Sequence, residues 1–209
     1  MADGNGRTLA DRDALRGRYK AVSRLAATKV LDRLDKHCRN FIARSPFLCL
    51  SSAAADGKAD VSPRGDPPGF VKVIDEHTLL IPDRSGNNRL DTLSNLIENP
   101  NVGLIFFVPG MEETLRIDGR AEVVAEHPAL AECAVNGSIP EVGVLVHVAH
   151  AHLHCAKALK RARLWDAGTQ IDRTDFPSLG QMIKDQIAEL PLSAEEADER
   201  IEAGYKKLY

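Results

Sequence analysis

The chain has 209 residues, of which 44% are hydrophobic and 27% charged, a composition typical of globular proteins and not of disordered ones. Its formal net charge of −3 gives no reason to expect nucleic acid or an anionic membrane as a partner, although local basic clusters can still bind a small anion. No apolar run reaches the roughly 18 residues of a membrane span. The polar start of the chain lacks the apolar core of a signal peptide, and the four cysteines form no C-x-x-C pair. We therefore expect a cytoplasmic protein with reduced thiols.

The first part of the chain predicts helices. Residues 11–44 contain no proline and one glycine, and apolar side chains recur along them at helical spacing. We expect two helices rather than one long helix. Ser45-Pro46 ends this stretch, because the residue before a proline is pushed out of the helical region.

The middle of the chain predicts mainly strands. Residues 47–52 and 59–63 flank a turn at Asp56-Gly57, and the proline- and glycine-rich residues 64–69 predict a loop. The remaining elements are expected strands at residues 70–74, 77–81, 102–108, 114–124 and 142–149, and expected helices at residues 88–98 and 128–135.

Six or seven consecutive strands with one mid-chain helix favour an α+β fold, a small antiparallel β-barrel with helices. Closure of the barrel would remove exposed sheet edges. The absence of a helix between each pair of strands argues against a doubly wound parallel sheet. We expect a helical N-terminal extension over residues 1–44, packed on a barrel over residues 45–165, and a helical tail over residues 166–209 within one structural domain.

Residues 85–89, Ser-Gly-Asn-Asn-Arg, form the first candidate site, between a strand end and a helix start. Free backbone N–H groups and the positive end of a helix dipole suit an anion there. Arg89 would add a forked cation for phosphate oxygens. Ordinary N-capping by Asn87 or Asn88, with Arg89 in solvent, explains these residues equally well without a ligand.

The stiff segment 62–69 is the second candidate. Its three prolines and two glycines hold side chains in place at low entropic cost, so that Ser62 and Arg64 can meet a phosphate. Gly65 would allow close approach of the backbone. A rigid hairpin connection is the alternative explanation.

Two further segments carry polar groups that a ligand or plain solvation would explain. In the alternating strand 114–124, Thr114 and Arg116 share the polar face with Asp118 and Arg120. In residues 154–165, basic residues share a helix face and Trp165 offers a flat surface for stacking.

Three alternate histidines, His150, His152 and His154, precede Cys155 and raise a zinc hypothesis. No second ligand pair stands at a diagnostic spacing and no H-E-x-x-H motif is present, so we expect no metal site. No G-x-S-x-G motif or activated cysteine indicates nucleophilic catalysis, and the catalytic residues stay unassigned.

Read in order, these segments resemble the pyridoxamine 5′-phosphate oxidase-like, FMN-binding split-barrel family, and most closely its bacterial branch with a helical N-terminal extension. The order and spacing of the motifs carry the resemblance more than any single motif does. The motifs are residues 45–47, 62–66, 80–83, 86–89, 99–104, 115–120 and 154–158.

The resemblance implies a six-stranded antiparallel Greek-key split barrel. It also implies a homodimer that binds FMN in a cleft between the subunits. Ser62, Arg64, Asn88 and Arg89 match the positions that hold the FMN phosphate. Pro82 and Asp83 would run beside the flavin ring, and Thr114 and Arg116 would face the ring of the partner's site. Residues 154–165 would close the cleft, with Lys157 or Arg161 near the cofactor and Trp165 near the ring.

Two departures limit what the resemblance implies about substrate. True pyridoxamine phosphate oxidases have Arg where Asp60 stands here and Lys where Gly65 stands, and their C-terminal substrate-phosphate signature is not recognisable. We therefore expect an FMN-dependent oxidoreductase that acts on a small organic substrate by hydride transfer at flavin N5, rather than an enzyme of vitamin B6 oxidation. The alternatives are a non-catalytic flavin- or haem-binding protein on the same barrel, and a structural dimer with an empty cleft.

Overall fold

The structure is a computed structural model that describes residues 8–187 and 189–209. By their internal contacts the residues group into two compact units, with the division between Val30 and Leu31. Helix α3 (Lys36–Arg44) therefore belongs to the same unit as the strands.

Short capped helices form the first part of the chain. Helices α1 (Arg12–Arg16) and α2 (Arg24–Thr28) bury no residue and begin where the side chains of Asp11 and Ser23 accept backbone N–H groups. Asp35 caps α3 in the same way. Residues 11–44 thus form three short helices, whereas two were predicted, because each cap starts a new helix.

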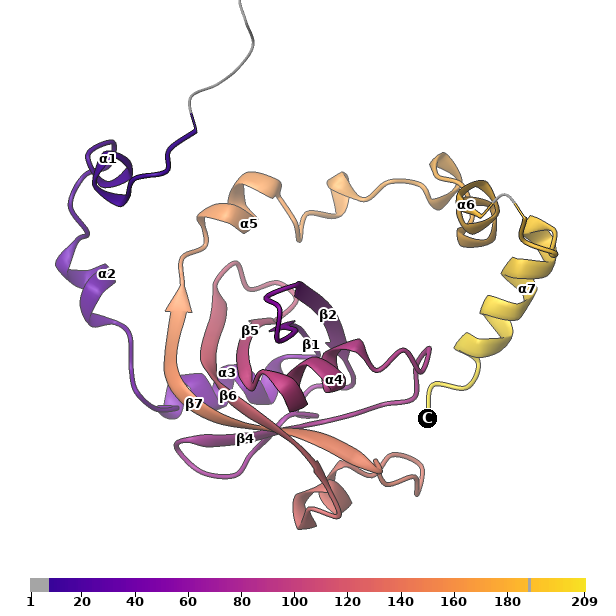
Figure 1. Cartoon of the computed structure of the whole chain (residues 1–209), viewed down its shortest axis with the longest axis horizontal. Helices are drawn as coiled ribbons and strands as arrows, with labels where there is room; N and C mark the ends of the chain where they lie inside the picture. The colour runs from indigo at the N-terminus through magenta and orange to yellow at the C-terminus, as the bar shows by residue number, and fades with distance from the viewer. Residues whose placement is uncertain (1–7, 188) are drawn as a thin grey trace, which may run out of the picture. The chain divides into compact units, whose positions relative to one another are not determined.

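Seven strands form one antiparallel sheet in the order β2-β1-β5-β6-β7-β4-β3. Figure 1 shows the long β6 and β7 running side by side through it. The strands are β1 (Phe47–Ala53), β2 (Ala59–Gly65), β3 (Lys72–Val73), β4 (Thr78–Pro82), β5 (Asn101–Phe107), β6 (Thr114–Ala125) and β7 (Val142–His154).

The expected closed six-stranded barrel is not what these strands form. The two ends of the strand order are β2 and β3, and among residues 8–187 and 189–209 no ladder joins them, so the seven-stranded sheet is open. Both strands are poor partners for closure. Pro63 in β2 lacks an N–H group, and β3 has only two residues after the Pro67-Pro68-Gly69 turn.

The larger of two hydrophobic clusters in the described residues fills the inner face of the sheet. Its largest fully buried side chains include Leu48 and Leu50 of β1 and Phe106 of β5. Helix α3 adds buried residues Cys38, Phe41 and Ile42. Helix α4 (Asp91–Glu98) buries Thr92, Leu93 and Leu96 and packs against β1, β2 and β6. The inward alternation predicted for β6 is confirmed at Leu115, Ile117 and Ala121, whereas Thr114 on the predicted polar face is buried.

A β-bulge bends the long β6–β7 ladder. The register shifts between Asp118 and Gly119, which pair with His150 and Val148, so Ala149 has no partner in β6. A Cβ atom on Gly119 would lie 2.1 Å from the carbonyl oxygen of His147. Glycine is therefore required for this close approach of two backbones.

Short helices complete the chain. They are the 3₁₀ helix η1 (Pro128–Cys133), α5 (Lys157–Ala162), the 3₁₀ helices η2 (Ala167–Thr169) and η3 (Arg173–Asp175), α6 (Leu179–Gln186) and α7 (Ala194–Tyr205). Helices α6 and α7 pack together, and Gly180 donates its N–H to Asp198 at 2.7 Å. No helix in the described part of the chain is both long and apolar enough to span a membrane.

Candidate functional site

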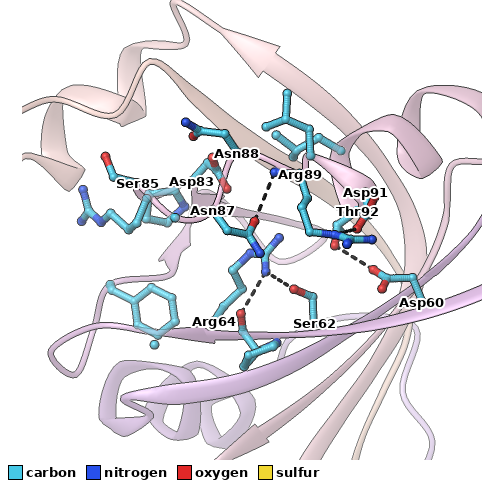
Figure 2. Close-up of a pocket in the computed structure, with 18 residues that line it drawn as sticks. Asp60, Ser62, Arg64, Asp83, Ser85, Asn87, Asn88, Arg89, Asp91 and Thr92 are labelled. Carbon is cyan, nitrogen blue, oxygen red and sulfur yellow. Dashed lines mark hydrogen bonds and ion pairs between the residues drawn. The ribbon is translucent and has the colours of Figure 1, made fainter. Parts of the chain in front are cut away.

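A polar cavity of about 440 Å³ lies where β2, the end of β4 and the start of α4 meet (Figure 2). Its walls come from Asp60, residues 62–65, Phe70, residues 82–90 and the first turn of α4. The volume falls within the range of roughly 300–1,000 Å³ that is usual for small-molecule sites.

Strand β2 places three polar side chains on one wall by simple alternation. Asp60, Ser62 and Arg64 are half-buried, whereas the residues between them are exposed. Asp60 also accepts a hydrogen bond of 2.9 Å from the Thr92 hydroxyl of α4, which joins the strand to the helix start. Asp60 was not among the site residues predicted from the sequence. Its spacing of two residues from Ser62 places it on the same face of the strand and could have predicted it.

The Arg64 guanidinium lies between the two walls of the cavity (Figure 2). Its Nη1 atom donates to the Ser62 hydroxyl at 2.6 Å and to the Pro63 carbonyl at 2.9 Å. Within the described residues, no carboxylate forms an ion pair with Arg64. The rest of its forked set of donors therefore remains available to an anion in the cavity.

Asp83 lies on the opposite wall, directly after β4 (Figure 2). Its side chain is partly removed from water, and this desolvation raises the pKa of the carboxyl, against the opposing effect of the nearby Arg64 charge. A carboxyl in this setting can accept a hydrogen bond from a ligand N–H group, or compete with an anionic ligand for Arg64.

The loop before α4 holds an unusual backbone. Asn88 and Leu90 have φ angles of 57° and 59°, in the left-handed region that residues other than glycine rarely adopt. Asn87 accepts the N–H of Arg89 at 3.1 Å. Strained backbone of this kind is concentrated at ligand sites.

The helix that follows begins later than predicted. Helix α4 starts at Asp91 rather than at Asn88, because the left-handed residues 88 and 90 cannot continue a helix. Neither Asn87 nor Asn88 caps it: Leu90 is the N-cap, without a side-chain hydrogen bond. Leu90 thus gives the backbone N–H groups of the first turn no side-chain cap.

Arg89 points along α4 to its own carboxylate partner. The Nε atom lies 2.7 Å from Oδ2 of Asp91, and 71% of the Arg89 side chain is exposed. Because exposed ion pairs are worth little, an anion with better geometry can take this guanidinium from Asp91.

Arg84 lines the cavity, but its guanidinium already contacts other protein groups outside it. It forms an ion pair of 2.7 Å with Asp66, whose side chain is only 2% exposed, and donates to the Cys133 carbonyl at 2.8 Å. The Tyr209 hydroxyl donates to the other oxygen of Asp66, and the Tyr209 ring lies under the Arg84 guanidinium. Arg84 therefore braces the wall, a role that no local sequence signal indicated.

The structure brings seven of the predicted site residues to one cavity and leaves five elsewhere. Those that line the cavity are Ser62, Arg64, Gly65, Pro82, Asp83, Asn88 and Arg89. Those that do not are Thr114, Arg116, Lys157, Arg161 and Trp165.

The five residues outside the cavity have local partners or surroundings of their own. Thr114 is buried at the start of β6. Arg116 is exposed and pairs with Asp118 at 2.9 Å. Trp165 donates its indole N–H to the Met111 carbonyl at 2.6 Å, and Lys157 and Arg161 are the first and fifth residues of α5. Because the resemblance places these groups at a subunit boundary, their role in binding stays a prediction.

The histidines of β7 have at most pairwise contacts with other described metal-ligating groups, as between His147 and Glu122 at 2.9 Å. Among the described residues, no set of three or more His, Cys, Asp or Glu side chains is placed to hold a metal ion. The four cysteines form no disulfide; Cys38 and Cys133 are buried, and Cys155 is exposed.

Comparison with known proteins links this fold and cavity to one family. The family model of pyridoxamine 5′-phosphate oxidase matches residues 34–155, which include β1 to β7 and every residue that lines the cavity. No curated protein gives a significant match to the sequence.

The solved structures that match this chain share little sequence with it. HupZ from Group A Streptococcus is 14% identical, with a TM-score of 0.46 over 56% of this chain and 90% of that chain. A putative pyridoxamine 5′-phosphate oxidase from Lactobacillus delbrueckii is 18% identical, with a TM-score of 0.44 over 58% and 94%. An FMN-binding protein from Syntrophomonas wolfei is 10% identical, with a TM-score of 0.44 over 68% and 96%.

Proposed function

Since the chain belongs to the pyridoxamine 5′-phosphate oxidase family, we propose that it is an FMN-binding flavoprotein, and that it acts as an FMN-dependent oxidoreductase on a small organic substrate. The main support for the proposal is the position of Arg64 between the walls of the polar cavity, where its guanidinium forms no ion pair with any carboxylate of the described residues.

The donor set of the cavity fits one phosphate group. Arg64 supplies charged donors, Ser62 a hydroxyl beside it, and the start of α4 supplies backbone N–H groups without a side-chain cap. Charge-assisted hydrogen bonds are worth about 1.5–3 kcal/mol each. Two or three such hydrogen bonds suffice to hold a phosphate in a partly desolvated site. Arg89 can add another if its guanidinium exchanges Asp91 for the phosphate.

Bound FMN would supply hydride-transfer chemistry at its N5 atom. The chain's own part is to hold the cofactor and limit its access to water. Pro82 and Asp83 form the wall opposite β2, where the ring would lie beside them. Asp83 is the lining carboxyl whose pKa is raised by desolvation, so it is the candidate for a hydrogen bond to the ring or the substrate.

An apolar outer face supports the proposal of a homodimer. On this face Phe47 of β1 pairs directly with Phe107 of β5, and Val61 of β2 and Ile105 of β5 share the face at other positions of the register. Val61 is 68% exposed and Phe47 39%. Arg116 lies directly opposite Ile105 on the same face. A second copy packed here would cover the apolar residues and bring Arg116 toward the partner, as the resemblance implies.

The same proposal extends to the finer fold and the setting of the protein. We infer that the open sheet is the single-chain form of a Greek-key split barrel, and that the protein works in the cytoplasm. Asp60, which lines the cavity where true oxidases have Arg, favours a substrate other than pyridoxamine phosphate.

The test is to compare FMN with riboflavin, which lacks the phosphate, in titrations of the purified chain. We expect a yellow protein with an absorption band at about 450 nm, and FMN binding at least tenfold tighter than riboflavin binding. Equal binding of the two would remove the phosphate pocket from the proposal. Tight haem binding that displaces FMN, with a Soret band, would favour the haem-binding alternative raised by the histidines of β7.

A further inference from the structure

A second cavity, of about 510 Å³, lies between α3, β3 and η1. It is separate from the proposed cofactor site, since Gly69 and Val71 line it whereas the intervening Phe70 lines the first cavity. The two cavities therefore lie on opposite sides of one short segment of backbone.

The floor of this cavity is apolar. Ile42 of α3, Val71 and Ala129 of η1 line it and are each less than 9% exposed, and Val73 of β3 adds a half-buried side chain. Burial of apolar ligand surface on such a floor contributes about 25 cal/mol per Å². An aliphatic or aromatic body of small size matches this surface.

The rim carries donors from three different elements. The Lys72 ammonium has one long contact, 3.4 Å to the Gly69 carbonyl, and the Arg39 guanidinium has one loose contact, 3.9 Å to Glu76. Neither group is therefore tightly held by the protein itself. Both are cations, so they suit a negatively charged group at the mouth of the cavity.

His127 adds a directed donor. Its Nδ1 atom accepts the N–H of Ala129 at 3.2 Å, as the N-cap of η1. The neutral ring must therefore carry its proton on Nε2, where it can donate. Glu132 is the only carboxylate among the described residues that line this cavity, so cations and the histidine outnumber it.

The floor of the cavity is apolar, and the cations at its rim have only long contacts with the protein. We therefore propose that this cavity binds a small amphipathic carboxylate, with its carboxylate at Lys72 and Arg39 and its apolar body on Ile42 and Val71. The site is independent of the cofactor, and its test does not require FMN.

Octanoate is the probe, titrated into the full chain by calorimetry, with octanamide as its neutral match. We expect saturable binding at one site, and octanamide binding at least tenfold more weakly. Lys72→Met should weaken octanoate binding about tenfold. Ala43→Phe, which fills the cavity from an exposed position on α3, should abolish it.

Two control variants locate the bound probe. Arg64→Met tests whether octanoate instead enters the first cavity, and Arg33→Met removes an exposed arginine outside both cavities. Unchanged binding in both controls supports the second cavity. The proposal is overturned if octanoate does not saturate, if octanamide binds equally well, if Arg64→Met abolishes binding, or if folded Ala43→Phe and Lys72→Met bind like the wild type.

Discussion

The Arg64 guanidinium contacts the Ser62 hydroxyl two residues earlier in the same strand, with Nη1 2.6 Å from Oγ. Because alternate residues of β2 share a face, this contact holds the arginine over the cavity rather than in solvent. The cation is thus pre-positioned for an anion by a neutral partner that does not cancel its charge.

Arg64→Ala is therefore expected to weaken FMN binding by about 1.5–3 kcal/mol, the value of one charge-assisted hydrogen bond. Arg89→Ala should cost less, since Arg89 is 71% exposed and must first leave Asp91. Fluorescence titration with FMN measures both. The exposed Arg33→Ala is the matched control, and a loss no larger for Arg64 than for Arg33 would contradict the assignment.

Asp66→Ala should destabilise the fold by about 2–4 kcal/mol, because it leaves Arg84 without its buried carboxylate partner. Asp118→Ala removes one acid from the Arg116–Asp118 pair, whose side chains are 53% and 34% exposed, and should cost less than about 1 kcal/mol. Chemical denaturation of both variants compares the two pairs. Equal losses would show that burial of the Asp66 pair has no consequence.

Gly119→Ala is predicted to be strongly destabilising, at the upper end of the roughly 1–3 kcal/mol of overpacking or beyond it, because the new Cβ meets the His147 carbonyl oxygen, a backbone atom that cannot move alone. The control is Gly204→Ala in α7, where an added Cβ meets nothing within 4 Å. That variant should be neutral or slightly more stable, since alanine is the better helix former. A native-like melting temperature for Gly119→Ala would refute the steric requirement at the bulge.

Asp83→Asn should stabilise the protein at neutral pH. Desolvation raises the pKa of Asp83 in the folded state, so ionisation of this carboxyl disfavours folding. The pH-dependent difference between variant and wild type should be absent below about pH 3, where the carboxyl is largely protonated in both states. It should grow as the pH rises through the folded pKa and stay constant above it.

Asp75→Asn should change the free energy of unfolding in the opposite direction and serves as the comparison. A hydrogen bond from the backbone N–H of His77 lowers the pKa of Asp75, so its ionised form stabilises the folded state and that contribution is lost as the pH falls. The variant should thus be less stable than the wild type at neutral pH. Urea denaturation of both variants and the wild type between pH 3 and 8 measures how each stability difference depends on pH. Two differences that change with pH in the same direction would contradict the prediction.

A thiol reagent at pH 8 should modify Cys155 first. Cys155 is exposed, whereas burial, together with the nearby Asp35 carboxylate, raises the pKa of Cys38 to about 11. At pH 8 about one Cys38 thiol in a thousand is then a thiolate, the reactive form. We expect the fastest phase to disappear in Cys155→Ser and Cys38 to react only on unfolding, and fast labelling of Cys38 in the native protein would count against its burial.

Local patterns in the sequence determined much of this protein. The alternation in residues 114–124 and the stiff turn after Arg64 follow from the two-residue period of a strand and from proline and glycine chemistry, which depend on neighbours in sequence alone. The same short-range rules brought Ser62 and Arg64, and separately Asn88 and Arg89, forward as candidates. The family resemblance joined them into one phosphate site, and all four line a single cavity.

Only the tertiary structure decided how the charges pair and where the sheet ends. Asp66, Arg84 and Tyr209 are far apart in sequence, and no periodicity predicts that they meet behind the cavity wall. The open edges at β2 and β3, and the later start of α4, likewise depend on which segments pack together. Electrostatic and packing energies act through space, so side chains brought together from distant parts of the chain determine them and a local pattern does not.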